Sequence, residues 1–584
     1  MKRWSIALLA PLLLGAAPAP LLVGVVHDQY GQPIAGARVQ FASQTTATDA
    51  AGTFSLEAET AEGTVAISCA YCAGVTLHAT AGDPVIAVVQ RFSAVADAAP
   101  NARDLRALQY SSAASAISLR PYAVLNDSSA PYPGPHLSLY GLSSFWGGLI
   151  VDDGVPNYDV AFAASTLQFL PAAALQSAQV LESADGFRYG TSAGAGTFLL
   201  GTLGDPGFSG EAVAGDERVA GATVNRSGLA ASLWASGTSV DSRDRVDAVA
   251  RMHVSDLDSI GATVIAASSR EYDPFGHSLD AAFNAAKISY DRAGALPVHA
   301  DLLVDGTGYN GNLYQDAGVS SAWSDFQVDA NVQSPGANGF FADASVRKST
   351  GFYADPTQPG IVAGTIGQSH VDAGVFVRNS VLSARAGVAA YSLTSDGGTG
   401  APLALSTHLI DPSIDVQYAP APQWSASIAS TEYFRIPSLL ELYTPPAAGS
   451  LQLSQAPVVV AKIGYGDLHR LRFEAVKAGG QTQASGGSVA WAIAPNLSLR
   501  AWSLAFSNSM EGTAAVASSL WATYDNPAGL RIDAVERRDL IDTAENQHLD
   551  ASLSVPAGAH LRWYAGTERR RFDRLYRTGL LFTP

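Results

Sequence analysis

Alternation of apolar and polar positions dominates the C-terminal two thirds of the chain. In HVDAGVFVR, residues 370–378, valine and alanine at 371, 373, 375 and 377 lie on one face, and His370, Asp372 and Arg378 lie on the other. The same period of two recurs in three further segments: 298–305, 413–418 and 548–555. A period of two places successive side chains on opposite faces of a β-strand. The pattern therefore predicts many strands, each with one apolar and one polar face.

The apolar faces of these strands need a cover. A soluble antiparallel sheet hides its apolar face behind another layer, but residues 207–584 contain no helical pattern to supply one. A closed barrel with its apolar face toward lipid solves this problem, because closure leaves no unpaired strand edge. The region is long enough for about 16 or about 22 strands of the length needed to cross a membrane. The unit that precedes it favours about 22, since so wide a barrel needs filling.

Short apolar strands separated by turn residues characterise residues 20–92. The turns Asp28–Gly31, Pro33–Gly36 and Asp49–Gly52 are rich in residues that supply the backbone angles of tight reversals. This spacing predicts a small β-sandwich. Residues 100–206 instead mix short strands, glycine turns and a short helical pattern, which predicts a compact α+β unit.

Residues 1–19 have the composition of an export signal. Lys2 and Arg3 precede an apolar run from Ile6 to Leu14, which is followed by small residues suited to cleavage. The run is too short to span a bilayer, and no later stretch approaches the roughly 20 apolar residues of a transmembrane helix. We therefore predict an exported protein whose signal peptide is removed and which has no helical anchor.

Charge and cysteine content narrow the partners. The formal net charge of −17 at pH 7 argues against nucleic acid, since phosphate binding requires a basic surface. Cys69 and Cys72 lie between strand-like flanks, which leaves open whether they form a disulfide. The flanking sequence does not predict the helix that follows the cysteines of a thioredoxin-like redox site. A zinc site would need a second pair of ligands, and His78 alone does not supply it. A structural role is expected for both cysteines.

Two stretches imitate catalytic motifs. Asp152-Asp153-Gly154 follows an apolar strand, and Gly190–Gly194 matches Gly-x-Ser-x-Gly. The first has no partner histidine or third ligand nearby, and the second lacks the strand before and the helix after that a nucleophile elbow requires. Asp and Gly favour tight reversals. We therefore predict two turns, no enzyme activity, no catalytic residue, no metal and no other cofactor.

The order of these regions resembles that of a TonB-dependent outer-membrane receptor with an N-terminal carboxypeptidase-regulatory-like module. GVVHDQYGQPIAGARV (24–39) is similar to the module, LSLYGLSSFWGGLIVDDGVPNYD (137–159) to the family's plug, and FRIPSLLELYTP (434–445) to a barrel segment. The implied fold is mainly β: a transmembrane antiparallel β-barrel of about 22 strands, an internal α+β plug and a small N-terminal β-sandwich. The implied domains are the signal peptide 1–19, the sandwich 20–92, the plug 100–206 and the barrel 207–584.

The resemblance implies active import of a large, scarce solute across the outer membrane, with an iron–siderophore as the default cargo. The implied partners are TonB of the inner-membrane energising complex, outer-membrane lipid, the barrel-assembly machinery and a small-molecule or chelate ligand. The implied ligand contacts are Tyr140, Asn157, Tyr158 and Asp159. The implied TonB contact comprises Asp83, Val85, Ile86, Val88 and Val89, a segment that fits the last strand of the sandwich equally well.

The chain departs from the family at positions that usually carry plug–barrel ion pairs. Tyr140 and Glu182–Ala184 stand where arginines are usual, and residues 449–460 lack the usual barrel glutamate. The plug arginines and the barrel glutamate are expected to be lost together, because a buried carboxylate left without its arginine costs several kcal/mol. The departures predict a plug that is held or released differently. They also support an alternative function, a passive outer-membrane pore or surface-binding protein that has lost energy coupling.

Overall fold

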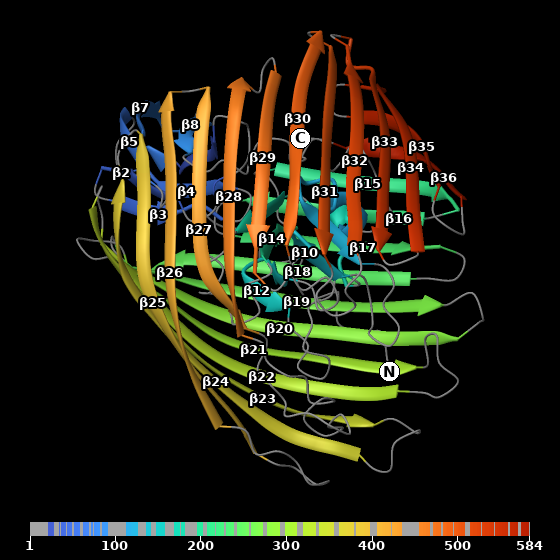
Figure 1. Ribbon diagram of the computed structural model, residues 1–584. Coiled ribbons are helices and arrows are strands. Elements are labelled where there is room, and N and C mark those ends of the chain that lie inside the picture. Colours follow the sequence, from blue (N-terminus) through green and yellow to red (C-terminus); the bar gives the residue numbers. More distant parts are fainter. Residues whose placement is uncertain are drawn as a thin grey trace, which may run out of the picture.

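The computed structural model describes most of the chain between Leu21 and Phe582. The described residues are 21–28, 34, 37–42, 44–49, 52–58, 62–68, 72–73, 75–81, 84–91, 113–126, 136–141, 148–157, 167, 169–175, 177–181, 196–202, 207–216, 218–226, 229–238, 242–255, 258–272, 277–292, 298–311, 319–334, 338–354, 361–378, 381–396, 406–421, 423–434, 455–467, 471–480, 483–494, 496–507, 514–526, 528–541, 544–558, 561–569 and 574–582. They form three parts: an N-terminal module, an inner plug and a barrel around the plug (Figure 1).

Two four-stranded sheets form the N-terminal module, with strand orders β4-β1-β8-β6 and β3-β2-β5-β7. Leu22, Phe41 and Phe54 belong to one buried core that both sheets share, which confirms the predicted sandwich. Gly24 allows the close packing of β1, since a Cβ there would lie 2.3 Å from the Val85 carbonyl oxygen. The strands are β1 (Leu21–Asp28), β2 (Arg38–Phe41), β3 (Gln44–Ala47), β4 (Thr53–Glu57), β5 (Glu62–Ser68), β6 (Cys72–Ala73), β7 (Val75–Thr80) and β8 (Val85–Arg91). Cys69 lies outside the described residues.

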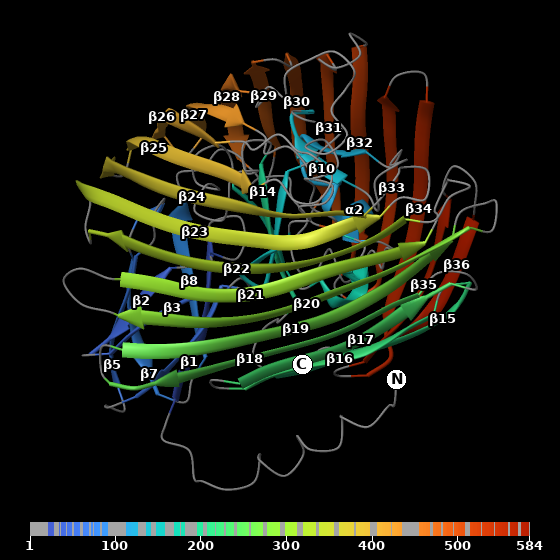
Figure 2. The ribbon, with the colours of Figure 1, turned by 90° about the horizontal axis from the view of Figure 1, so that it is seen from below.

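The plug, defined here as the described elements from α2 to β14, lies inside the barrel (Figure 2). Its larger sheet has the order β12-β11-β14-β13, in which β11 pairs antiparallel with β12 and parallel with β14. Every residue of β11 and β14 is buried, as expected of strands that are covered on both faces. The elements are α2 (Ala113–Ile117), β9 (Ala123–Asn126), β10 (His136–Leu139), β11 (Leu149–Asp152), β12 (Val155–Asn157), η2 (Ala172–Ala174), β13 (Ser177–Leu181) and β14 (Thr197–Gly201).

The barrel is closed and contains the strands β15 to β36 in sequence order, each antiparallel to its neighbours. Closure is made by β15 and β36, where Gly210 lies opposite Phe582. The 22 strands agree with the wider of the two expected barrels. They are β15 (Gly207–Gly215), β16 (Arg218–Arg226), β17 (Leu229–Gly237), β18 (Ser242–His253), β19 (Asp258–Tyr272), β20 (Ser278–Arg292), β21 (Val298–Gly311), β22 (Val319–Gln333), β23 (Asn338–Ala354), β24 (Ile361–Arg378), β25 (Leu382–Asp396), β26 (Ser406–Ala421), β27 (Trp424–Phe434), β28 (Gln455–Asp467), β29 (Leu471–Gly479), β30 (Ala484–Ala494), β31 (Leu497–Ser507), β32 (Ala514–Asp525), β33 (Arg531–Ile541), β34 (Ala544–Pro556), β35 (Leu561–Arg569) and β36 (Arg574–Phe582).

The barrel has an apolar outer face and a more polar inner face. In β24, Val371 and Val375 are 53% and 60% exposed, whereas His370 and Asp372 are buried in the lumen. Large apolar side chains such as Leu233 and Ile288 are exposed on other strands in the same way. A soluble protein rarely exposes so large an apolar surface, and lipid is its natural cover. The expected membrane-spanning barrel is therefore confirmed. No helix in the described part of the chain is long and apolar enough to cross a membrane.

The two ends of the barrel differ in the length of their connections. At one end the intervals between strands include 397–405 and 435–454, whereas at the other the longest intervals are 293–297 and 526–530. The N-terminal module meets the short-connection end, where Nη1 of Arg251 donates a hydrogen bond to the Ala47 carbonyl oxygen at 3.2 Å. Module and long connections therefore lie at opposite ends.

Candidate functional site

A buried ionic cluster joins the plug to the barrel wall. Arg245 of β18 donates through Nη1 to Asp152 of β11, and its Nη2 lies 3.6 Å from Oδ2 of Asp153. On its own strand, Arg245 binds Asp247 through Nη2 at 2.7 Å and through Nε at 2.9 Å. Thr202 of the plug donates its hydroxyl to Asp153 at 2.5 Å. We call these five residues the Arg245 cluster.

Local backbone geometry aims the plug carboxylates at Arg245. Strand β11 ends at Asp152, and Asp153 and Gly154 then adopt φ of 49° and 79°. Such angles are readily adopted by Gly and tolerated by Asp, which confirms the predicted turn. The Asp153 N–H donates to the Leu200 carbonyl oxygen at 2.9 Å, so the turn is held against β14. The sequence pattern correctly indicated the turn but not the arginine that it faces.

The Arg245 cluster holds three carboxyl groups and one guanidinium, and all of their side chains are at most 4% exposed. Burial, followed by the neighbouring carboxylates of Asp152 and Asp247, raises the pKa of Asp153 to about 8, against the opposing effect of Arg245. Burial therefore favours the protonated form of Asp153 in the docked plug. Removing the arginine would leave the remaining charges buried and unpaired, which is strongly destabilising for a buried ion pair.

The same plug turn makes a second polar contact with the barrel. Nζ of Lys287 on β20 donates to the Gly154 carbonyl oxygen at 3.1 Å and lies 3.3 Å from Oδ2 of Asp301. A Cβ at position 154 would come within 2.6 Å of this ammonium group. Gly154 is thus required both by its positive φ and by the approach of Lys287.

Aromatic side chains form the other main plug–barrel contact. Tyr122 of the plug meets Trp502 of β31 edge-on, with ring centroids 6.3 Å apart, and lies 5.7 Å from Tyr140. Phe169 stacks on Phe283 of β20 at 5.7 Å. These residues, apart from Phe169 and Phe283, belong to one buried apolar cluster that spans plug and barrel. Plug and barrel therefore share a continuous core.

The expected ligand contacts occupy different environments. Tyr140 and Asn157 are only 2% and 3% exposed. Tyr140 packs in the plug–barrel core below Nζ of Lys462, which lies 5.4 Å from its ring centroid. In this conformation Tyr140 is a packing residue, and neither side chain presents a surface to a solute. Tyr158 and Asp159 lie outside the described residues.

The expected TonB contact falls on a strand of the module. Val85, Ile86, Val88 and Val89 lie in β8, which pairs in parallel with β1 from Val85 to Val89. Val85 and Val89 are buried in the module core, while Ile86 is 68% exposed. This is the alternative that the sequence left open, and a TonB contact by the same residues stays a prediction. Asp83 lies outside the described residues.

The structure contains a plug–barrel ion pair in which the acidic and basic partners are exchanged relative to the family pattern. The family pattern puts arginines on the plug and glutamates on the barrel, but here the plug carries Asp152 and Asp153 and the barrel carries Arg245. A plug–barrel ion pair is therefore present, but it differs from the usual set, in line with the expectation that the plug is held differently. A barrel arginine on an alternating strand gave no sequence signal that it would meet the plug.

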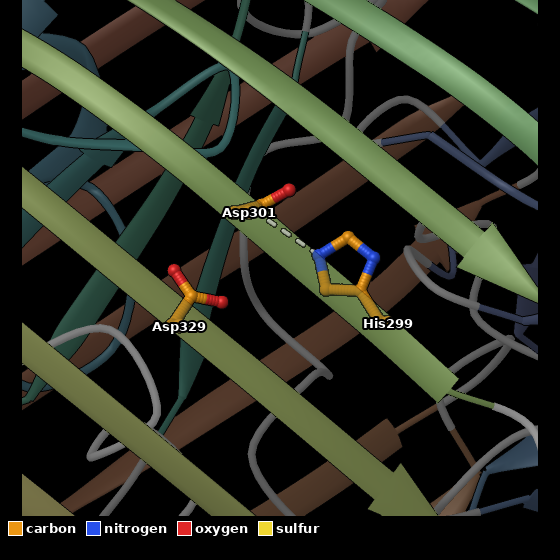
Figure 3. A group of neighbouring side chains, drawn as sticks. All are labelled: His299, Asp301 and Asp329. Atoms are coloured by element: carbon orange, nitrogen blue, oxygen red, sulfur yellow. Dashed lines mark ion pairs between the residues drawn. The ribbon is translucent and has the colours of Figure 1, made fainter.

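One group of lumen side chains could hold a metal ion, although the sequence indicated no metal ligands. His299 and Asp301 of β21 and Asp329 of β22 each offer a ligand atom, and these atoms all lie within 4.8 Å of one another (Figure 3). The sequence pattern placed His299 and Asp301 on the polar face of one strand. Only strand pairing brings Asp329 beside them, directly opposite Asp301.

Solved structures similar to this chain include a copper transporter and two receptors. The copper transporter OprC superposes with a TM-score of 0.67 at 10% identity, over 82% of this chain and 97% of that chain. The alcaligin receptor FauA from Bordetella pertussis gives 0.65 at 11% identity, over 85% and 96%, and the siderophore receptor PirA from Pseudomonas aeruginosa gives 0.61 at 11%, over 82% and 98%. No family model and no curated protein matches the chain. The chain therefore has the fold of the TonB-dependent outer-membrane receptors, as the resemblance implied.

Proposed function

We propose that this protein is an outer-membrane receptor that imports a solute through a TonB-driven change of its plug. The observation that carries the proposal is a wide, closed barrel whose lumen is filled by a separate folded unit. A pore that served only diffusion would have no need of a unit bound through the Arg245 cluster and a shared aromatic core. A plug bound by a few separable contacts suits gated passage instead.

The barrel ends support one orientation. Outer-membrane barrels have short periplasmic turns and longer extracellular loops. The end with the intervals 397–405 and 435–454 is then extracellular, and the module at the opposite end is periplasmic. This orientation gives solute access from outside and gives an inner-membrane partner access to the N-terminal part of the chain.

The proposed cargo is a metal ion or a metal chelate. The similar structures are named as a copper transporter and as receptors for alcaligin and siderophores, which supports this class of cargo without selecting a member. An iron–siderophore is our default. The proposed ligand contact is the plug apex at Asn157, Tyr158 and Asp159, with Tyr140 nearby, although Tyr140 and Asn157 are buried in this conformation.

Site-directed crosslinking to TonB in cells tests the proposal. Single cysteines are placed at successive positions from 83 to 100, with the two native cysteines replaced, and crosslinking is measured with and without candidate metal chelates. We expect at least one position to crosslink, more strongly with the cargo. A protein that is folded in the outer membrane but never crosslinks would be a passive pore or a surface-binding protein instead.

A further inference from the structure

Pairing of three neighbouring strands gathers four titratable side chains at the short-connection end of the lumen. Asp291 of β20 lies opposite His299 of β21, and Asp301 of β21 lies opposite Asp329 of β22. Figure 3 shows the side chains of His299, Asp301 and Asp329 on the same face of their strands. Acidic groups that lie directly opposite each other destabilise an antiparallel pair. The Asp301–Asp329 pair therefore needs positive charge beside it, and Lys287, 3.3 Å from Oδ2 of Asp301, supplies only part of it.

The histidine is already oriented as a ligand. Its Nδ1 lies 2.6 Å from Oδ1 of Asp291, and its Nε2 lies 3.1 Å from Oδ2 of Asp301. A carboxylate that accepts a hydrogen bond from one ring nitrogen orients the other nitrogen toward a metal, and a metal bound here would displace the proton that Nε2 directs at Asp301. Asp291 thus has the role of an orienting partner, and Nε2 of His299 faces the carboxylates.

Asp301 supplies an independent sign of a missing ligand. The residue is 9% exposed, and its Oδ1 is buried with no hydrogen-bond partner among the described residues. A buried carboxylate oxygen in that state is costly unless a proton or a cation meets it. Lys287 contacts only the other oxygen, Oδ2, at 3.3 Å.

We propose that His299, Asp301 and Asp329 bind a divalent transition-metal ion of the zinc type, with Asp291 orienting His299. One imidazole nitrogen and two carboxylates suit such an ion better than calcium or magnesium, which prefer oxygen alone. Bonds of about 2.1 Å place neighbouring ligand atoms roughly 3.0 to 3.4 Å apart. The 3.1 Å between Nε2 of His299 and Oδ2 of Asp301 already meets this requirement.

The metal site is linked to the plug through one side chain. Lys287 bridges Oδ2 of Asp301 and the carbonyl oxygen of Gly154, which lies in the turn of the Arg245 cluster. A bound cation repels this ammonium group and takes over Asp301, so metal and Lys287 compete for the same carboxylate. By linkage, metal occupancy and the contact of Lys287 with the plug influence each other.

Metal titration of the purified, detergent-solubilised full chain tests the proposal. Zn²⁺ binding is measured by calorimetry, and Co²⁺ is added as a spectroscopic probe whose visible absorption reports nitrogen and oxygen ligation. The variants are His299→Gln, Asp301→Asn, Asp329→Asn, Asp291→Asn and Lys287→Met. The matched control is His370→Gln, which removes another lumen histidine, 3.3 Å from Asp343. Heat-modifiable migration on gels verifies that each barrel is folded.

We expect one Zn²⁺ per chain, with loss of this site in His299→Gln and Asp301→Asn. Asp291→Asn should weaken binding about 10- to 100-fold, the usual effect of losing an orienting partner. Lys287→Met should tighten it about tenfold or more, because a nearby positive charge is removed. The control should bind like the original chain.

Two results would overturn the proposal: absence of stoichiometric binding in the folded original chain, or binding that survives both His299→Gln and Asp301→Asn unchanged. Asp329→Asn and Asp291→Asn keep the test decisive if either of the other variants does not fold. The inference does not rest on the proposed import function, since the titration uses the isolated protein without TonB. A titration without metal binding would not affect the outcome of the crosslinking test, and an absence of crosslinking would not affect the titration.

Discussion

Two of the contacts that hold the plug in the barrel have opposite chemistry. At the Arg245 cluster, Asp152 and Asp153 of the plug meet a single barrel arginine in full burial. At the aromatic contact, Tyr122 meets Trp502 edge-on, with no charge at either ring. The first depends on exact pairing and on protonation, whereas the second depends only on the apolar area that is removed from water.

This difference suggests that the two contacts have different roles in plug docking. Apolar contacts are non-directional and weaken gradually as surfaces separate. A buried ionic contact behaves more like a switch, because burying one charged partner alone destabilises the protein far more than having neither partner. We infer that the aromatic contact supplies steady adhesion and that the Arg245 cluster makes release an all-or-none event. Four substitutions test this comparison through one measurement, the urea concentration at which trypsin begins to cleave the plug in the detergent-solubilised protein.

Arg245→Ala should have the largest effect. It leaves buried carboxylates without their cation, and we expect plug docking to weaken by about 3 to 5 kcal/mol. Cleavage should begin at much lower urea. Arg270→Ala is the control, since Arg270 pairs with Asp280 at a half-exposed position of the barrel and should have little influence. An unchanged cleavage profile for Arg245→Ala would mean that the cluster does not hold the plug.

Trp502→Leu should come second, with a loss of about 2 kcal/mol from the aromatic contact and the buried area. The loss should be the same at pH 5 and pH 9, because no charged partner is involved. Trp491→Leu serves as the control, since Trp491 is 45% exposed on the same barrel. A strong pH dependence of the Trp502→Leu effect would contradict these different roles.

Lys287→Met should weaken docking by about 1 to 2 kcal/mol, because it removes a charge-assisted hydrogen bond to the Gly154 carbonyl oxygen and keeps most of the side-chain volume. Lys348→Met, on an exposed position of β23, is the matched control. If Lys287→Met left the cleavage profile unchanged, the turn would be held by the Arg245 cluster alone.

Asp153→Asn differs from the other three substitutions in sign: it should strengthen docking at neutral pH, because asparagine takes up no proton on burial, and it should flatten the pH dependence. In the docked plug Asp153 keeps its proton up to about pH 8, whereas an exposed aspartate loses it near its ordinary pKa of about 4. Docking is thus fully favoured below about pH 4 and weakens as the pH rises toward about 8, above which this contribution is lost. The asparagine variant should lose that slope between pH 5 and pH 9. Retention of the full slope would assign the proton to another group.

Much of the architecture could be predicted because it depends on local pattern. The alternation in 370–378 correctly predicted which side chains of β24 face outward, and the Asp and Gly residues at 153–154 correctly predicted a turn. The short apolar strands near the N-terminus correctly predicted a sandwich. Each of these features arises within a few residues, where backbone geometry and the side-chain period are decisive.

The candidate sites could not be predicted in the same way, because their members come from distant segments. Asp152 and Arg245 meet only because the plug sits inside the barrel, and Asp301 faces Asp329 only because β21 and β22 pair in one register. A charged residue on an alternating strand looks the same in sequence whether it faces water, plug or metal.

The sequence by itself determined a membrane barrel with an inner unit and an N-terminal sandwich, because hydrophobic periodicity and turn chemistry act over short distances. Tertiary structure decided the polarity of the plug–barrel ion pair, the burial of Tyr140 and the grouping of His299 with Asp301 and Asp329. Those outcomes depend on how deeply each charged group is buried and on which partner lies close to it. Strand register and the position of the plug in the barrel decide both.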